Sequence, residues 1–264
     1  MKISIITISN NHAKYIEDCI NSVLNQKYKN IEHIIIDNKS DDGTLDILKR
    51  IKKKDKRFKF VSEKDSGPAS ALNKGFNLAD GDIFYFLNSD DYLLKDSLDK
   101  IHNFFINNTE IDLLLSGGHL VDEKGNLIKK LYSSKQNIYL FLRGINEFFQ
   151  QGMFFKKSLY LKTNGFNELN HVSWDGELFF DFLKIKASYK RIFAETAAFR
   201  VQKNSITQKK EYILDLQKQL NKLFLDYYKI NNYPIMYKIL HIFKYIYDPL
   251  LALMKLKNQL KIYN

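Results

Sequence analysis

The sequence predicts an α/β fold, with a mostly parallel sheet flanked by helices and a C-terminal amphipathic helical extension. Three observations support it. Short β-rich runs alternate with helical periodicity through the first half, polar residues follow these runs, and an apolar stripe at helical spacing begins near Lys209. A chain of 264 residues can bury the core of one such domain and carry an appendage.

Four short runs predict the strands of the first half: residues 3–8, 33–36, 58–61 and 83–87. Between the first two, apolar residues from Ile16 to Leu24 recur at the spacing of one helix face. Two further crossover helices are expected around residues 45–51 and 72–76. Polar residues gather after the strands, at the edge where open α/β sheets bind ligands.

The second half is less regular. Strands are expected at 113–117 and 152–155, with a hairpin at Lys124-Gly125-Asn126 and a turn at Asn164-Gly165. Apolar residues between Leu178 and Ile185 predict a helix that begins just after Trp174-Asp175. The chain from Lys209 onward is expected to be helical, with a second amphipathic segment after Pro234.

Composition narrows the class of partner. The 41 basic residues outnumber the 30 acidic ones, and the net charge of +11 favours an anionic partner such as nucleic acid, a phospholipid surface or a phosphorylated substrate. No zinc-finger spacing or other nucleic-acid motif is present, so nucleic acid is disfavoured. A single cysteine, Cys19, and an N-terminus without a secretory signal predict a cytoplasmic protein.

The strongest local pattern is Asp90-Asp91, which directly follows a strand predicted to be buried. Adjacent carboxylates repel, so a fold that places them at a strand end usually supplies a cation or hydrogen-bond donors. Mg²⁺ and Mn²⁺ bind to one or two carboxylates together with the phosphate oxygens of a substrate. The alternative is a pair of aspartates that caps the following helix.

Four segments in this order resemble family 2 glycosyltransferases, in particular those of bacterial surface-polysaccharide synthesis. They are IIIDNKSDDGT (34–44), SEKDSG (62–67), ALNKG (71–75) and DIFYFLNSDD (82–91). Shorter matches follow at 151–156, 165–168 and 175–180. The resemblance implies a GT-A fold, with a catalytic domain at 1–208 made of a nucleotide-sugar half (1–110) and an acceptor half (111–208). Residues 209–264 would form a basic amphipathic helical segment.

The same resemblance assigns donor-binding roles. Asp37 would accept hydrogen bonds from the base or ribose beside the Thr7 segment, Asp65 would close the base pocket, and Asp90 would contact the ribose. Taken alone, Asp37 could equally be an aspartate that caps a turn.

Asp91 is expected to hold the metal, Mn²⁺ or Mg²⁺, that bridges the diphosphate of the donor. A bound metal would neutralise charge on the leaving nucleoside diphosphate. Gln202 stands where relatives often carry a histidine that helps to bind diphosphate or metal, and Arg200 or Lys203 would compensate.

Asp175 aligns with the general base of the family. An acceptor hydroxyl is a poor nucleophile until a carboxylate takes its proton, and a single displacement from the side opposite the leaving group inverts the anomeric centre. Glu177 is the substitute candidate. The alternative is that Asp175 caps the helix it precedes.

The C-terminal residues 229–264 contain six lysines against one acid, Asp248, interleaved with aromatic and aliphatic residues. This pattern suits a helix in an anionic membrane interface, although no apolar run is long enough to span a bilayer. A helical hairpin packed on the catalytic domain, or a dimer contact, is the alternative. If the segment binds membrane, we expect a peripheral protein on the inner face of the cell membrane and a lipid-linked acceptor.

The sequence therefore predicts an inverting transferase that moves a sugar from a nucleotide donor, UDP above all, to a hydroxyl of a glycan or polyprenyl-diphosphate-linked acceptor in surface-polysaccharide (O-antigen or capsule-like) synthesis. A Mg²⁺-dependent nucleotidyltransferase is one alternative, but residues 8–12 do not form the Gly-rich phosphate loop it would normally carry. A non-catalytic protein that binds anionic surfaces through a degenerate transferase scaffold is another.

Overall fold

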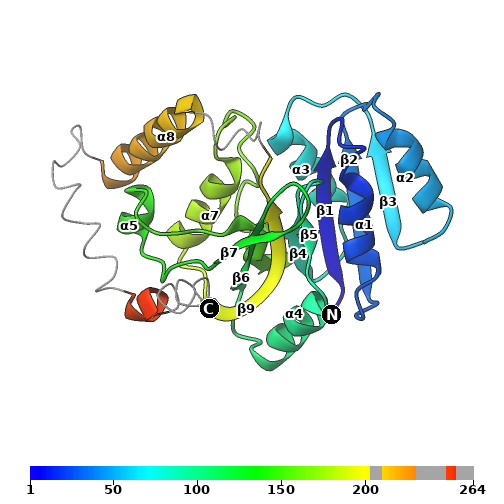
Figure 1. The fold of residues 1–264 in the computed structure, drawn as a ribbon. Coiled ribbons are helices and arrows are strands. Elements are labelled where there is room, and N and C mark those ends of the chain that lie inside the picture. Colours follow the sequence, from blue (N-terminus) through cyan, green and yellow to red (C-terminus); the bar gives the residue numbers. More distant parts are fainter. Residues whose placement is uncertain (203–209, 230–247, 254–264) are drawn as a thin grey trace.

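The computed structural model describes residues 1–202, 210–229 and 248–253 (Figure 1). One sheet runs through it, in the order β3-β2-β1-β4-β8-β6-β9-β5, with β7 paired to β6. The strands are β1 (Ile3–Ser9), β2 (Ile31–Asp37), β3 (Phe58–Ser62), β4 (Ile83–Phe86), β5 (Tyr92–Leu93), β6 (Leu113–Val121), β7 (Leu127–Leu131), β8 (Met153–Lys156) and β9 (Tyr189–Arg200). The helices are α1 (Ile16–Leu24), α2 (Thr44–Lys52), α3 (Pro68–Leu78), α4 (Ser97–Asn107), α5 (Ile138–Leu142), α6 (Lys157–Tyr160), α7 (Trp174–Lys184) and α8 (Lys210–Tyr228), with a 3-10 helix η1 (Gln150–Gly152).

The first half has the architecture that the sequence predicts. β3, β2, β1 and β4 are parallel neighbours, and α1, α2 and α3 connect them as crossover helices. Every residue of β2 is buried, as expected of a parallel strand covered on both faces. The apolar stripe of α1 is buried in full, which explains why its spacing identified the helix.

The second half makes the sheet mixed. β8 is antiparallel to both β4 and β6, whereas β9 runs parallel to β6 and antiparallel to β5. The strands at 113–117 and 152–155 and the hairpin at residues 124–126 are confirmed. The helix expected just after Trp174-Asp175 is also present, but it begins at Trp174 itself. The twelve-residue strand β9, the short strand β5 and helices α4, α5 and α6 were not predicted.

An aromatic core joins the two halves. Phe76 of α3 packs against Phe84 of β4 and Phe155 of β8, with ring centroids 5.0 and 5.8 Å apart. Trp174, the first residue of α7, packs on Phe86, the last residue of β4, at 5.1 Å. This contact places the start of α7 beside the strand end that leads into Asp90-Asp91.

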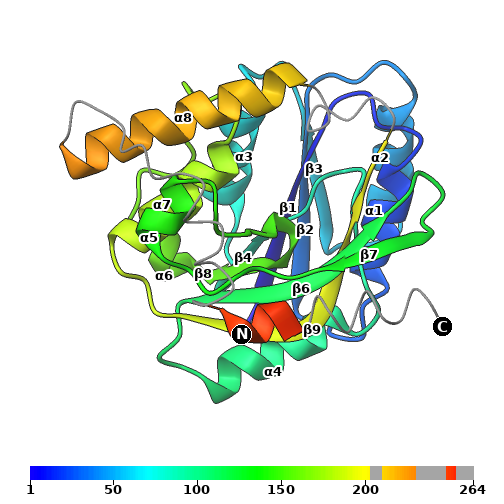
Figure 2. The same ribbon diagram turned by 60° about the vertical axis from the view of Figure 1, so that its left-hand side comes forward.

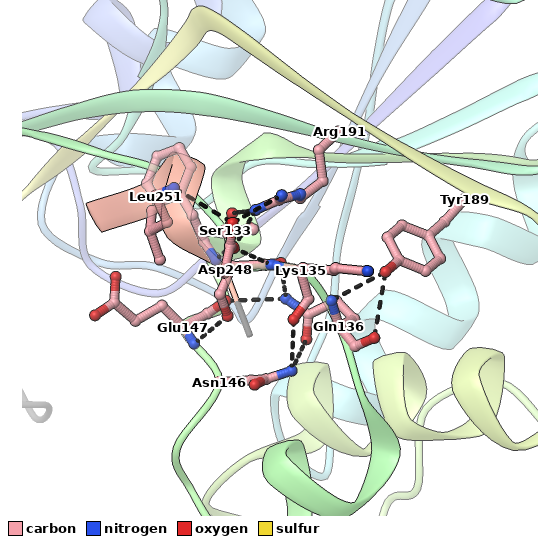
Figure 3. Close-up of polar contacts among 11 residues, drawn as sticks. Ser133, Lys135, Gln136, Asn146, Glu147, Tyr189, Arg191, Asp248 and Leu251 are labelled. Carbon is pink, nitrogen blue, oxygen red and sulfur yellow. Dashed lines mark hydrogen bonds and ion pairs between the residues drawn. The ribbon is translucent and has the colours of Figure 1, made fainter. Parts of the chain in front are cut away.

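The C-terminal part of the chain contacts the acceptor half. α8 lies along α5 and α7 (Figure 1), and its Phe224 is buried with the guanidinium of Arg143 over the ring at 5.5 Å. Residues 249–253 form a short helical segment that is fixed by Asp248, which pairs with Arg191 at 2.6 Å (Figure 3). α8 is helical as predicted. Apart from residues 248–253, the second amphipathic segment lies outside the described residues, so the full extension stays a prediction.

Candidate active site

The carboxyl ends of the parallel strands meet at one edge of the sheet. In the strand register Ser9 lies beside Asp37, and Asp37 beside Ser62, while the amide of Leu87 donates to the carbonyl of Ile6 at 2.9 Å. The predicted donor residues therefore come from neighbouring strand ends, although their side chains are not equally accessible.

Asp37 is fully buried and engaged by its own turn. One carboxylate oxygen accepts from the hydroxyl of Ser40 at 2.5 Å, and the other accepts from the Ser40 amide at 3.1 Å and the Ser62 hydroxyl at 2.7 Å. It thus has the turn-capping role given as the alternative, and it ties the ends of β2 and β3 together. Its contact with a base or ribose stays a prediction.

The side chain of Thr7 faces the layer between the sheet and α1. Its hydroxyl lies 3.0 Å from Nε2 of His33 and 3.9 Å from the sulfur of Cys19, and it is fully buried. Burial lowers the pKa of His33 to about 3, so this imidazole is neutral, and burial raises the pKa of the Cys19 thiol. Any contact of the Thr7 segment with a donor would therefore involve its main chain or its neighbours.

Asp65 lies in the loop between β3 and α3. Its amide donates to the side-chain oxygen of Asn38 at 3.1 Å, and its carboxylate accepts from the amide of Gly67 at 2.9 Å. Partial burial, together with the charge of Asp37, raises the pKa of this carboxyl. The loop thus holds Asp65 close to Asp37, as a shared base pocket would require.

Asp91 is buried and surrounded by donors. One oxygen accepts from the main-chain amide of Arg200 at 2.9 Å, and the other accepts from the side-chain amides of Gln151 at 2.8 Å and Asn88 at 3.1 Å. Only 1% of the residue is exposed. Burial and the neighbouring charge of Asp90 raise the pKa of Asp91 to about 8. Asp91 therefore joins the end of β4 to η1 and to the end of β9.

Asp90 has a different environment from that of its neighbour. Its side chain is half-buried, with one oxygen accepting from the amide of Gln202 at 2.9 Å, and its main-chain carbonyl accepts from Nε of Arg200 at 2.9 Å. Gln202 thus lies at the carboxylate where the resemblance expected a histidine. Lys203, the other candidate for compensation, lies outside the described residues.

His12 is a neighbour of this site that the sequence did not single out. Its Nδ1 forms a hydrogen bond with the hydroxyl of Ser89, and its amide donates to the hydroxyl of Thr44 at 3.1 Å. The loop after β1 is therefore tied to the segment that carries the two aspartates. The only signal in the sequence was a histidine three residues after the end of β1.

The carboxylate pair fits a hard divalent cation that shares its coordination with a substrate. The described part of the chain contains no group of three or more His, Cys, Asp or Glu that could enclose a metal by itself. Mg²⁺ and Mn²⁺ accept this arrangement, because one or two carboxylates suffice when phosphate oxygens and water complete the shell. Asp90 has the accessible carboxylate for such a site.

Asp175 and Glu177 lie in the first turn of α7 but differ in their partners. The carboxylate of Glu177 accepts from the side-chain amides of Asn167 at 2.9 Å, Asn170 at 2.6 Å and Gln219 at 3.4 Å. Burial raises the pKa of Asp175, opposed by hydrogen bonds from the main-chain amides of Gly176 and of Asp175 itself. Glu177 thus fixes a loop and α8 to α7. Asp175 is the second residue of α7, whose N-cap is Ser173, so it does not precede and cap the helix as the alternative supposed.

The start of α8 lies close to Asp175. Burial and the nearby charge of Asp175 raise the pKa of Tyr212 to about 12. Trp174 meanwhile packs on Phe86, as described above. The candidate base therefore lies at the junction of the strand end that leads to Asp90, the start of α7 and the start of α8.

Comparison with known proteins agrees with this geometry. Residues 4–163 match the family model for glycosyl transferase family 2. An uncharacterized glycosyltransferase of Haemophilus influenzae is 36% identical over 212 residues, which is 79% of this chain and 82% of that protein. TuaG of Bacillus subtilis, whose name assigns it to teichuronic acid biosynthesis, is 37% identical over 52% of this chain and about half, 54%, of its own length.

Among solved structures, residues 1–349 of Staphylococcus aureus TarS in complex with UDP-GlcNAc superpose with a TM-score of 0.66 at 20% identity, covering 85% of this chain and 67% of that one. The fold and the strand-end carboxylates define the class, a glycosyltransferase with a GT-A-like fold. More narrowly, the chain belongs to glycosyltransferase family 2.

Proposed function

We propose that this transferase moves a sugar from a UDP donor to a hydroxyl of a glycan or polyprenyl-diphosphate-linked glycan, with inversion, in bacterial surface-polysaccharide synthesis. The observation that carries the proposal is the carboxylate of Asp90, half-buried at the end of β4 and next to Gln202. UDP as the donor nucleotide is supported by the fold shared with TarS, which was solved with UDP-GlcNAc. A polysaccharide acceptor is supported by the similarity to TuaG.

The environments of the two aspartates support a different division of roles from the one that the resemblance implied. Asp91 is only 1% exposed and accepts three hydrogen bonds, so a direct metal contact would cost it buried partners. We therefore assign the metal to Asp90 and a positioning role to Asp91, which holds η1 and the end of β9 against the motif. When bound, Mn²⁺ or Mg²⁺ would neutralise the diphosphate that leaves.

Asp175 is proposed as the general base. Its carboxylate removes the proton of the acceptor hydroxyl as that oxygen attacks the anomeric carbon of the donor, and the bond to the diphosphate breaks on the opposite face. The raised pKa of Asp175 makes it a better proton acceptor than an ordinary aspartate. Glu177 is less suited to this role, since three side-chain amides already occupy its oxygens.

Contact with an anionic membrane is a further part of the proposal. The sequence of residues 229–264 contains six lysines and one acid, Asp248, and that acid is buried and pairs with Arg191. The described residues include no helix long and apolar enough to cross a bilayer, so the contact we propose is peripheral.

A donor assay tests the proposal against its two alternatives. We expect slow, Mn²⁺- or Mg²⁺-dependent hydrolysis of a UDP-sugar without acceptor, and stabilisation in a thermal-shift screen by UDP-sugars with metal, where ligand at about 100 times Kd adds roughly 2.7 kcal/mol. A non-catalytic scaffold gives no hydrolysis. A nucleotidyltransferase would instead form a nucleotide-sugar and pyrophosphate from UTP and a sugar phosphate, and that product would refute the proposal.

A further inference from the structure

A groove of about 790 Å³ lies beside the candidate active site, between α1, β5 and the turn of the β6–β7 hairpin. We call it the α1–hairpin groove. Its volume is in the range of natural ligand sites. Arg200 lines the groove and also donates to the main-chain carbonyl of Asp90. The groove therefore adjoins the metal-site segment and shares Arg200 with it, but Asp90, Asp91 and Asp175 do not line it.

The hairpin turn that forms one wall is held in place. Oδ1 of Asp122 accepts from the amides of Lys124 and Asn126 at 2.9 and 2.8 Å, and Gly125 takes the left-handed φ of +87° that closes the turn. Lys14 pairs with Glu123 at 3.6 Å, which ties the turn to the segment before α1. Figure 2 shows the hairpin reaching across to α1, so the groove has two fixed walls.

The walls carry an excess of positive charge. Lys27, Lys95 and Lys124 are exposed, and none of them forms an ion pair with any residue that the structure describes. Of the two acids that also line the groove, Asp18 pairs with Arg200 at 3.6 Å, and Asp96 remains without a basic partner in the described chain. Three lysines without ion pairs around one pocket favour an anionic ligand, and walls of one sign concentrate counter-charges.

The remaining lining groups suit a polyol. Asn21 lies on α1 and Asn25 is its C-cap, and both are exposed residues that line the groove. Their amides can donate to and accept from hydroxyl groups. Tyr92 contributes an aromatic ring to the same pocket. Amides and an aromatic ring among cations fit sugar rings that carry acidic groups better than they fit a bare phosphate.

From these contacts we infer that the α1–hairpin groove binds an anionic saccharide, one that carries carboxylate or phosphate groups. The inference rests on the proposed function in one respect, because it makes this saccharide a stretch of the glycan to which the sugar is added. The groove supplies affinity through Lys27, Lys95 and Lys124, while Asp90 and Asp175 belong to the separate transfer site.

Calorimetric titration of the full chain with a glucuronate-containing tetrasaccharide, without donor or metal, tests the inference. A variant with Lys27→Gln, Lys95→Gln and Lys124→Gln should bind about tenfold more weakly, since each exposed charge contact adds modestly to affinity. A matched control with Lys49→Gln, Lys53→Gln and Lys54→Gln removes the same charge from α2 and the turn after it, outside the groove, and should bind like the wild type.

Two further ligands, a neutral saccharide and pyrophosphate, test whether the groove binds an acidic saccharide or only phosphate groups. A neutral tetrasaccharide of the same length should bind at least about tenfold more weakly than the acidic one. Pyrophosphate binding without tetrasaccharide binding would overturn the saccharide assignment, as would unchanged affinity in the groove variant or an equal loss in the control. Metal-dependent UDP-sugar hydrolysis, measured in all three proteins, reports on the proposed function independently of these results.

Discussion

Replacing Asp175 with asparagine removes a proton acceptor and leaves the size of the side chain almost unchanged. The remaining Oδ1 can still accept from the main-chain amides that now bond the carboxylate. Loss of a positioned general base costs about 10² to 10⁴ in rate. We therefore expect Asp175→Asn to bind UDP and Mn²⁺ like the wild type and to lose transfer by that factor in a coupled assay with acceptor.

The stability of the same variant should change little. Because burial raises the pKa of Asp175 in the folded state, the ionised carboxylate lowers stability at neutral pH, and stability returns as the pH falls through the raised pKa. Asparagine removes that cost and forfeits a small favourable interaction of a negative charge with the helix start, typically 0.3–1 kcal/mol. We expect a melting temperature within about 4 °C of the wild type.

The pH profile of the wild type follows from the same pKa. A base works only when deprotonated, so the transfer rate should decline as the pH falls through the pKa of Asp175, above the ordinary value of 3.8. The residual transfer rate of Asp175→Asn should not show this decline at low pH.

Glu177→Gln is the matched control for Asp175→Asn. It disturbs the bonds from Asn167, Asn170 and Gln219, which should cost about 1–3 kcal/mol of stability while transfer persists below the melting temperature. The opposite pattern, with near wild-type transfer in Asp175→Asn and an inactive but folded Glu177→Gln, would refute the assignment and make Glu177 the base.

Other consequences concern stability and the C-terminus. Gly75→Ala places a Cβ against Cγ2 of Ile6 and should destabilise the protein by about 1–3 kcal/mol in urea unfolding, whereas unchanged stability would mean that α3 can move off the sheet. Burial alone would raise the pKa of Glu32, but hydrogen bonds from Lys59, Ser4 and the main-chain amide of Asp80 lower it to about 2. The stability difference between wild type and Glu32→Gln should therefore shrink as the pH falls from 4.5 towards 2. Truncation after about residue 229 should weaken sedimentation with anionic vesicles more than donor hydrolysis, because each lysine near such a surface contributes roughly 1 kcal/mol; equal cosedimentation would make the segment a packing element.

The parts of the fold that the sequence predicted are those where periodicity and burial agree. The stripe from Ile16 to Leu24 identified α1 because each of its apolar residues faces the core. β9 escaped prediction because Tyr189–Arg200 mixes charged with apolar residues, and most of its first seven residues are only partly buried. β5 has two residues, too few for any periodicity.

The site was predictable as a location but not in its detail. Asp90 and Asp91 are adjacent residues of the same type. Two hydrogen-bond partners of Asp91, Gln151 and Arg200, lie 60 and 109 residues further along the chain. Their environments therefore depend on tertiary contacts that no local pattern encodes. The same holds for Glu177, whose partner Gln219 comes from α8.

Titration calorimetry of UDP with and without Mn²⁺, on the wild type, Asp90→Asn and Asp91→Asn, tests the central claim most directly. We predict that Mn²⁺ strengthens UDP binding to the wild type and that Asp90→Asn abolishes this effect. Asp91→Asn should keep it, weakened by about 10- to 100-fold at most, as expected for a residue that orients a metal ligand. Full Mn²⁺ dependence in Asp90→Asn, together with none in a folded Asp91→Asn, would return the metal to Asp91, and no Mn²⁺ effect on the wild type would contradict the metal-dependent donor site itself.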